Sequence, residues 1–141
     1  MLLYNNGLLV VELMQEENLM LVDLPDIQSN NLPQVWHALQ FVLEHINARE
    51  VTLLLLDSSK SVVEVGIEEY AAVSKQFAME LMTTKLQKVA RVASKDNQRE
   101  EKVAQASSQI QKQVPRNITF SNFTRREEAV AWLLGRENHD K

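Results

Sequence analysis

The feature that most constrains this chain is a run of four leucines, Leu53–Leu56, followed directly by Asp57. An apolar run this short, ended by polar residues, is typical of a strand buried on both faces. Sheets with such strands carry helices on both sides, and their ligand or partner sites lie where strands end. The sequence therefore predicts a central strand over 51–56 and a site in the polar residues that follow it.

The size and composition of the chain indicate one cytoplasmic domain. With 141 residues, it is long enough to bury about 68–70% of its unfolded surface. We expect a single domain over 1–135 and a loose tail over 136–141. The absence of cysteine indicates a reducing compartment and excludes disulfides and thiol nucleophiles. No apolar segment reaches the ~20 residues that span a bilayer, and the start lacks the basic residues of a signal peptide.

Charge is distributed unevenly along the chain, although the net charge is only −4. Residues 1–57 hold eight acidic side chains and one basic one, whereas residues 85–126 hold ten basic and three acidic side chains. Such a split is compatible with a partner surface or with head-to-tail self-association. The alternative, which we favour, is two solvated faces of one domain.

Hydrophobic periodicity predicts an α/β fold, with a mixed sheet of about five strands and about four helices in the order β-β-α-β-α-β-α-β-α. The first two strands, over 8–13 and 19–22, form an antiparallel hairpin, and the later strands are mostly parallel. The other strands are expected over 51–56, 86–92 and 118–120. The helices are expected over 33–46, 67–81, 97–112 and 124–134.

Several local signals mark where these helices begin and end. Asn31 is a candidate N-cap of the first helix, and Pro33 suits its first turn. Thr124 and Glu127 have the spacing of a capping box that opens the last helix, and Gly135 is placed to end it. The apolar stripe of the first helix is Val35, Leu39, Val42, Leu43 and Ile46.

Residue patterns for catalysis or cofactor binding are weak. His37 and His45 are eight positions apart rather than the four of a two-histidine metal site. The acid pairs 68–69 and 127–128 stand at expected helix starts, where carboxylates stabilise the helix dipole. With three glycines in the chain there is no phosphate-binding loop. We therefore expect no metal, no cofactor and no enzymatic activity.

Nucleic acid is not an expected partner either. The basic stretch over 85–102 lacks interleaved aromatic residues, and the whole chain is acidic. Trp36 and Met79 lie off the main apolar stripes of their helices, so they are candidates for an apolar groove or a homodimer contact. The alternative is that they belong to the core.

The polar residues after the central strand form the candidate site. A serine in such a loop can bind a phosphate or act as a nucleophile, but no G-x-S-x-G elbow surrounds these serines. The alternative is an ordinary polar loop between a strand and a helix. The predicted partner or ligand surface consists of Asp57, Ser58, Ser59, Ser61, Glu64, Gly66 and Glu68.

The chain resembles the STAS fold of bacterial anti-sigma-factor antagonists and their STAS-like relatives. The first similar feature is the strand that ends at Asp57, followed by a polar loop and the helix from Ile67. The other is the segment 86–93, followed by a helix, by Thr119-Phe120 and by the segment 127–133. The second pattern is similar to the ending of small bacterial STAS-like proteins. The resemblance covers about Leu8 to Gly135 and implies a non-enzymatic regulatory or protein-interaction module.

The chain departs from the antagonists at one position. They carry a phosphorylated serine in an Asp-Ser-Ser-Gly motif at the start of the helix, whereas this chain has Val65 before Gly66, and its Asp57-Ser58-Ser59 comes earlier. We therefore expect an interaction module without the serine phosphoswitch. It is expected to bind a protein partner and is a candidate homodimer. A binding domain for a small apolar or lipid-like ligand is the alternative, and it requires an enclosed apolar pocket.

Overall fold

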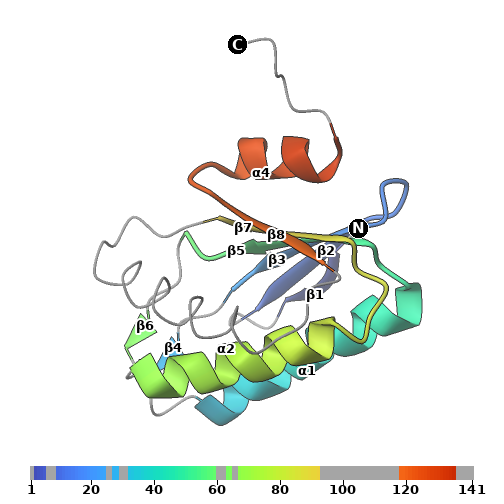
Figure 1. Cartoon of the computed structure of the whole chain (residues 1–141). Helices are drawn as coiled ribbons and strands as arrows, with labels where there is room; N and C mark the ends of the chain where they lie inside the picture. The colour runs from blue at the N-terminus through green and yellow to red at the C-terminus, as the bar shows by residue number, and fades with distance from the viewer. Residues whose placement is uncertain are drawn as a thin grey trace.

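The computed structural model describes residues 2–5, 9–24, 27–28, 32–59, 63–64, 67–92 and 118–135. A six-stranded sheet lies between helices on its two faces (Figure 1). Its strands are β1 (Leu2–Asn5), β2 (Val10–Met14), β3 (Leu19–Asp23), β5 (Leu53–Asp57), β7 (Lys88–Val92) and β8 (Thr119–Phe123). Two short strands, β4 (Ile27–Gln28) and β6 (Val63–Glu64), form a separate parallel pair. The helices are α1 (Leu32–Arg49), α2 (Ile67–Leu81) and α4 (Arg126–Leu133).

The strands follow the order β1-β2-β3-β5-β7-β8 across the sheet. The first three are antiparallel, and β3, β5, β7 and β8 run parallel. The predicted mixed α/β fold is confirmed, because all five expected strands lie in this sheet. The edge strand β1 is an addition, since the first strand was expected to begin at residue 8. The helix expected over 97–112 and the tail over 136–141 lie outside the described residues, so the full predicted order stays a prediction.

The central strand β5 is buried on both faces, as its leucine run predicts. Leu54 and Leu55 are both fully buried, but they belong to different core clusters. Leu54 packs with side chains of α1 and α2, and Leu55 packs with Ala129 and Leu133 of α4. Figure 1 shows α1 and α2 on one face of the sheet and α4 on the other.

The turn between β2 and β3 depends on the conformation of Asn18. Its backbone lies in the left-handed region, with φ of 56°, and its N–H donates to the Gln15 carbonyl at 3.2 Å. Asparagine tolerates this conformation better than most residues because its side chain bonds locally. Here the Asn18 side-chain amide donates to the Glu50 carbonyl at 2.9 Å. The turn therefore connects the hairpin to the end of α1.

The first helix ends in a Schellman motif. Glu50 adopts a left-handed φ of 51°, and its N–H donates to the Asn47 carbonyl at 3.3 Å. The Val51 N–H donates to the Ile46 carbonyl at 3.0 Å, which completes the pair of bonds that defines this motif. All five residues of the apolar stripe predicted for this helix are buried. Asn31, its expected cap, lies outside the described residues.

The last helix begins differently from the prediction. The expected capping box does not form, because Arg125 occupies the N-cap position and makes no side-chain cap hydrogen bond. Gly135 does follow the end of the helix with a left-handed φ of 69°, as expected. Strand β8 extends to Phe123 rather than ending at Phe120. Phe123 can continue the strand because its ring packs on Trp132 of α4 at a centroid distance of 5.6 Å.

None of the helices within the described ranges is both long and apolar enough to cross a bilayer.

Candidate functional site

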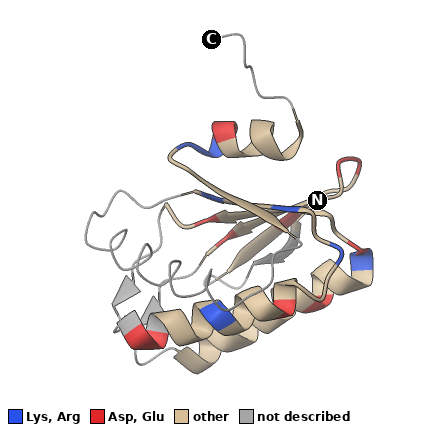
Figure 2. Ribbon diagram, viewed as in Figure 1, with Lys and Arg blue, Asp and Glu red and all other residues tan. Residues whose placement is uncertain are grey.

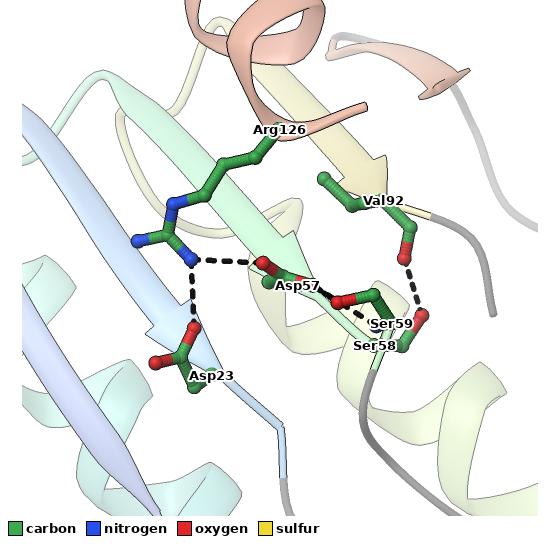
Figure 3. A network of polar contacts seen from close by, with 6 residues as sticks. All are labelled: Asp23, Asp57, Ser58, Ser59, Val92 and Arg126. Atoms are coloured by element: carbon green, nitrogen blue, oxygen red, sulfur yellow. Dashed lines mark hydrogen bonds and ion pairs between the residues drawn. The ribbon is translucent and has the colours of Figure 1, made fainter. Parts of the chain in front are cut away.

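The carboxyl ends of β3 and β5 bring two aspartates side by side. Asp23 ends β3, Asp57 ends β5, and the two residues are paired in register across the parallel strands. Arg126, the first residue of α4, reaches both of them (Figure 3). Its Nη1 donates to Asp23 Oδ1 and to Asp57 Oδ2, each at 2.8 Å. We call these three residues the arginine clamp, because they connect α4 to the ends of two strands.

Ser59 and the clamp together keep Asp57 ionised. Partial burial opposes its negative charge, since the side chain is only 11% exposed. Hydrogen bonds from Ser59 and Arg126, together with the positive charge of Arg126, outweigh this burial and lower the pKa of Asp57 below its usual value. Burial likewise opposes the charge of Arg126, but its two carboxylate partners raise its pKa. Neither group is therefore suited to exchange protons near neutral pH.

The two serines after Asp57 have different surroundings. Ser58 is fully buried, and its hydroxyl donates to the Val92 carbonyl at 2.6 Å. Ser59 is exposed, and both its N–H and its hydroxyl donate to Asp57 Oδ1, at 2.9 and 2.6 Å. Ser58 therefore joins β5 to the end of β7, whereas Ser59 closes a local turn on Asp57.

The other residues of the predicted surface lie in several places. Glu68 is exposed in the first turn of α2, and Glu64 is in β6. Ser61 and Gly66 lie outside the described residues. Ser58 is fully buried, so its side chain does not reach the surface in this structure. The structure thus brings Asp57 and Ser59 together at the carboxyl end of β5 and places Glu68 on the helix that follows.

Sequence reasoning missed two members of this site, Asp23 and Arg126. Their contact joins positions that are 103 residues apart, and no local pattern reports such a distance. One signal was present: a cation in the first turn of a helix is unfavourable to the helix dipole. An arginine at that position therefore indicates a carboxylate partner elsewhere in the fold.

Acidic side chains gather around this edge of the sheet. Figure 2 shows acidic groups at the ends of the strands and at the start of α2, with basic groups at the start of α4. Asp23 keeps about half of its side chain exposed (49%), so this member of the clamp is partly open to solvent. In the parts of the chain that the structure describes, no group of three or more metal-ligating side chains was found. The carboxyl ends of the strands therefore form a charged surface whose groups bond to one another. Asp23, Ser59 and Glu68 reach solvent there.

Comparisons of the chain with protein-family models, with curated proteins and with solved structures gave no match.

Proposed function

We propose that this chain is a non-enzymatic regulatory or protein-interaction module of STAS-like fold that works without a serine phosphoswitch. The observation that carries the proposal is that the polar groups at the carboxyl ends of the strands form their hydrogen bonds with one another. Asp57 is bonded to Arg126 and Ser59, and Ser58 is buried against Val92. Groups bonded in this way form a rigid surface, whereas catalysis requires groups whose proton affinity is tuned to the reaction.

The absence of a phosphoswitch is supported by the positions of the serines. The hydroxyl of Ser58 has no solvent exposure, so a kinase could not reach it in the folded protein. Ser59 is exposed, but it lies in the turn directly after β5 and is held by Asp57. The family position, next to the glycine that precedes α2, is Val65 in this chain.

The proposed contact surface consists of Asp23, Ser59 and Glu68. Asp23 and Glu68 are acidic, the first half-exposed and the second exposed, which favours a partner that presents basic side chains. A rim of this kind changes the association rate and its salt dependence more than the final affinity. We therefore expect a complex that weakens as salt is added.

The test is quantitative co-purification from the native host with the intact chain and two charge-reversal variants. Glu68→Lys should reduce recovery of the partner, most strongly at low salt, where charges are screened least. Glu16→Lys is the matched control, because Glu16 is an equally exposed acid in the turn at the opposite end of β3; it should leave recovery unchanged. Equal recovery with both variants, or no specific partner with the unmodified chain, would contradict the proposal.

The alternative, an apolar ligand, requires an enclosed apolar pocket. Among the described residues, the hollow beside the β2–β3 turn is open to solvent and has three polar residues in its lining: Gln15, Glu16 and Glu17. Such a hollow does not have the character of a lipid site. Native mass spectrometry of the purified chain tests the ligand-binding alternative. A lipid-sized adduct would make ligand binding the leading proposal in place of the interaction module.

A further inference from the structure

Strand β8 is the last strand of the sheet, and its outer side is an unpaired edge within the described residues. Its five residues, Thr119–Phe123, include no charged side chain and no proline. Natural proteins protect exposed edges with lysine, proline, a bulge or a very short strand. The opposite edge carries such protection, because the register of β1 shifts between Leu2 and Tyr4. The edge formed by β8 has none of these features.

The backbone register shows which groups of β8 face outward. The Thr119 N–H donates to the Gln87 carbonyl at 3.0 Å, so the backbone of Thr119 faces β7. Orientation alternates along a strand, so Ser121 and Phe123 also direct their backbone groups to β7, whereas Phe120 and Asn122 direct theirs outward. Phe120 adds an apolar side chain that is 45% exposed. The edge therefore presents two donors, two acceptors and one aromatic ring.

We infer that this edge pairs with β8 of a second copy of the chain, in an antiparallel and two-fold symmetric contact centred on Ser121. In this register, Phe120 of each copy stands opposite Asn122 of the other, and the two exchange both backbone hydrogen bonds. Ser121 stands opposite its own symmetry mate as a non-hydrogen-bonded pair. All four outward groups are then satisfied by the same groups of the second copy, which is the requirement of an isologous interface.

Charge and symmetry favour a second copy over a different protein. The strand is uncharged, so its self-pairing brings no like charges face to face along Thr119–Phe123. The symmetric register also needs no complementary sequence from another chain. Helix α4 packs mainly over β7 and β5 and contacts β8 less. This inference concerns a different surface from the proposed function and does not depend on it.

The contact is small, and this sets the expected affinity. One pair of five-residue strands buries less surface than the ~1,200 Å² at which stable interfaces begin. We therefore expect a weak dimer that forms in the micromolar range and dissociates on dilution. Sedimentation of the intact chain should show the 16.2 kDa monomer at low concentration and a species of twice that mass at high concentration.

Cysteine cross-linking tests the register directly, because the chain contains no cysteine of its own. Ser121→Cys should form an intermolecular disulfide under mild oxidation, since the non-hydrogen-bonded pair places the two Cα atoms about 4.5 Å apart, within disulfide range. Thr119→Cys is the matched control on the same strand and face. Its symmetry mate would lie about 13 Å away, beyond the reach of a disulfide.

A charge on the edge should abolish the dimer without unfolding the chain. Asn122→Lys, introduced alone and together with Ser121→Cys, should remove both the heavier species and the cross-link. Asn47→Lys makes the same substitution at an exposed position of α1 and should change neither. Unchanged thermal unfolding of both lysine variants would exclude a folding defect.

Three outcomes would overturn the inference. A chain that sediments as a monomer up to submillimolar concentration has no such contact. A dimer in which Ser121→Cys does not cross-link is built from another surface. Equal cross-linking of Ser121→Cys and Thr119→Cys would refute the register centred on Ser121.

Discussion

The two faces of the sheet are covered in different ways. On the face under α1 and α2, eighteen of the described residues form one buried apolar cluster, whereas six form the cluster under α4. The eight-residue α4 has polar contacts at both ends instead. Arg126 holds its start, and the Lys88 ammonium holds its end by donating to the Trp132 carbonyl at 3.1 Å and lying 5.1 Å from the Trp132 ring centroid. The α1/α2 face therefore has the larger apolar core, and charged contacts at both ends of α4 supplement the smaller apolar core of the other face.

The largest expected effect on stability comes from truncating one leucine side chain on each face of β5. Leu54 and Leu55 are adjacent, equally buried and identical in chemistry, but they face α1/α2 and α4, respectively. We expect Leu54→Ala to lower the free energy of unfolding by about 3–5 kcal/mol and Leu55→Ala by about 2–3 kcal/mol, because a short helix can move to fill part of the cavity. Urea unfolding measures both values. A larger loss for Leu55→Ala would invert the comparison.

A smaller effect is expected when the arginine clamp is removed. Arg126→Leu leaves Asp23 and Asp57 side by side without a cation, and partial exposure limits the loss to about 1 kcal/mol. Hydrogen exchange should accelerate in α4 and stay unchanged in α1. Arg125→Leu, one residue earlier and exposed, is the control and should have little effect. Acceleration in both helices would mean that the two faces open together.

The pH dependence of stability offers a test of the same clamp. The pKa of Asp57 is lower in the folded chain than in the unfolded one, so its contribution is fully present above the unfolded value of about 4. It is lost as the pH falls through the lower, folded-state pKa. Asp57→Asn should remove this contribution and flatten the decline in the free energy of unfolding over that acidic interval. Parallel curves for the variant and the unmodified chain would show that Asp57 and its partners Ser59 and Arg126 do not control acid stability.

The smallest predicted effect is a gain on the α1/α2 face. Glu50 holds a left-handed conformation that glycine adopts without a Cβ clash. Glu50→Gly should raise the unfolding midpoint by about 1–3 °C, despite the loss of its exposed ion pair with Lys85. Arg49→Gly, at the last residue of α1, where the backbone is not left-handed, is the matched control and should lower the midpoint. A lower midpoint for Glu50→Gly would show that the ion pair outweighs the backbone strain.

Most of the fold could be predicted because its signals are local. The leucines of β5, the apolar stripe of α1 and the polar turn before Leu19 each report their own segment. Strands β4 and β6 could not be predicted, since two residues are too few to show a period. The capping box at Thr124 was wrong because the spacing of a motif does not ensure its hydrogen bonds.

The candidate site was predictable only in part. The strand end at Asp57 is visible in the sequence as the place where an apolar run stops. Its partners are not, because Asp23 and Arg126 meet Asp57 through the order of the strands and the placement of α4. The burial of Ser58 also depends on this packing, since its hydroxyl reaches a carbonyl on the neighbouring strand β7.

The separation of Arg126 from its two partners has a consequence for synthesis. A ribosome completes the hairpin, α1 and β5 long before it reaches the residue that neutralises Asp23 and Asp57, which precede it by 103 and 69 positions. Until then, the nascent chain carries paired negative charges beside an uncovered apolar strip containing Leu19 and Leu55. Chaperones and proteases recognise exposed strips of this kind. Translation products that stop before α4 should therefore be degraded faster than the full chain.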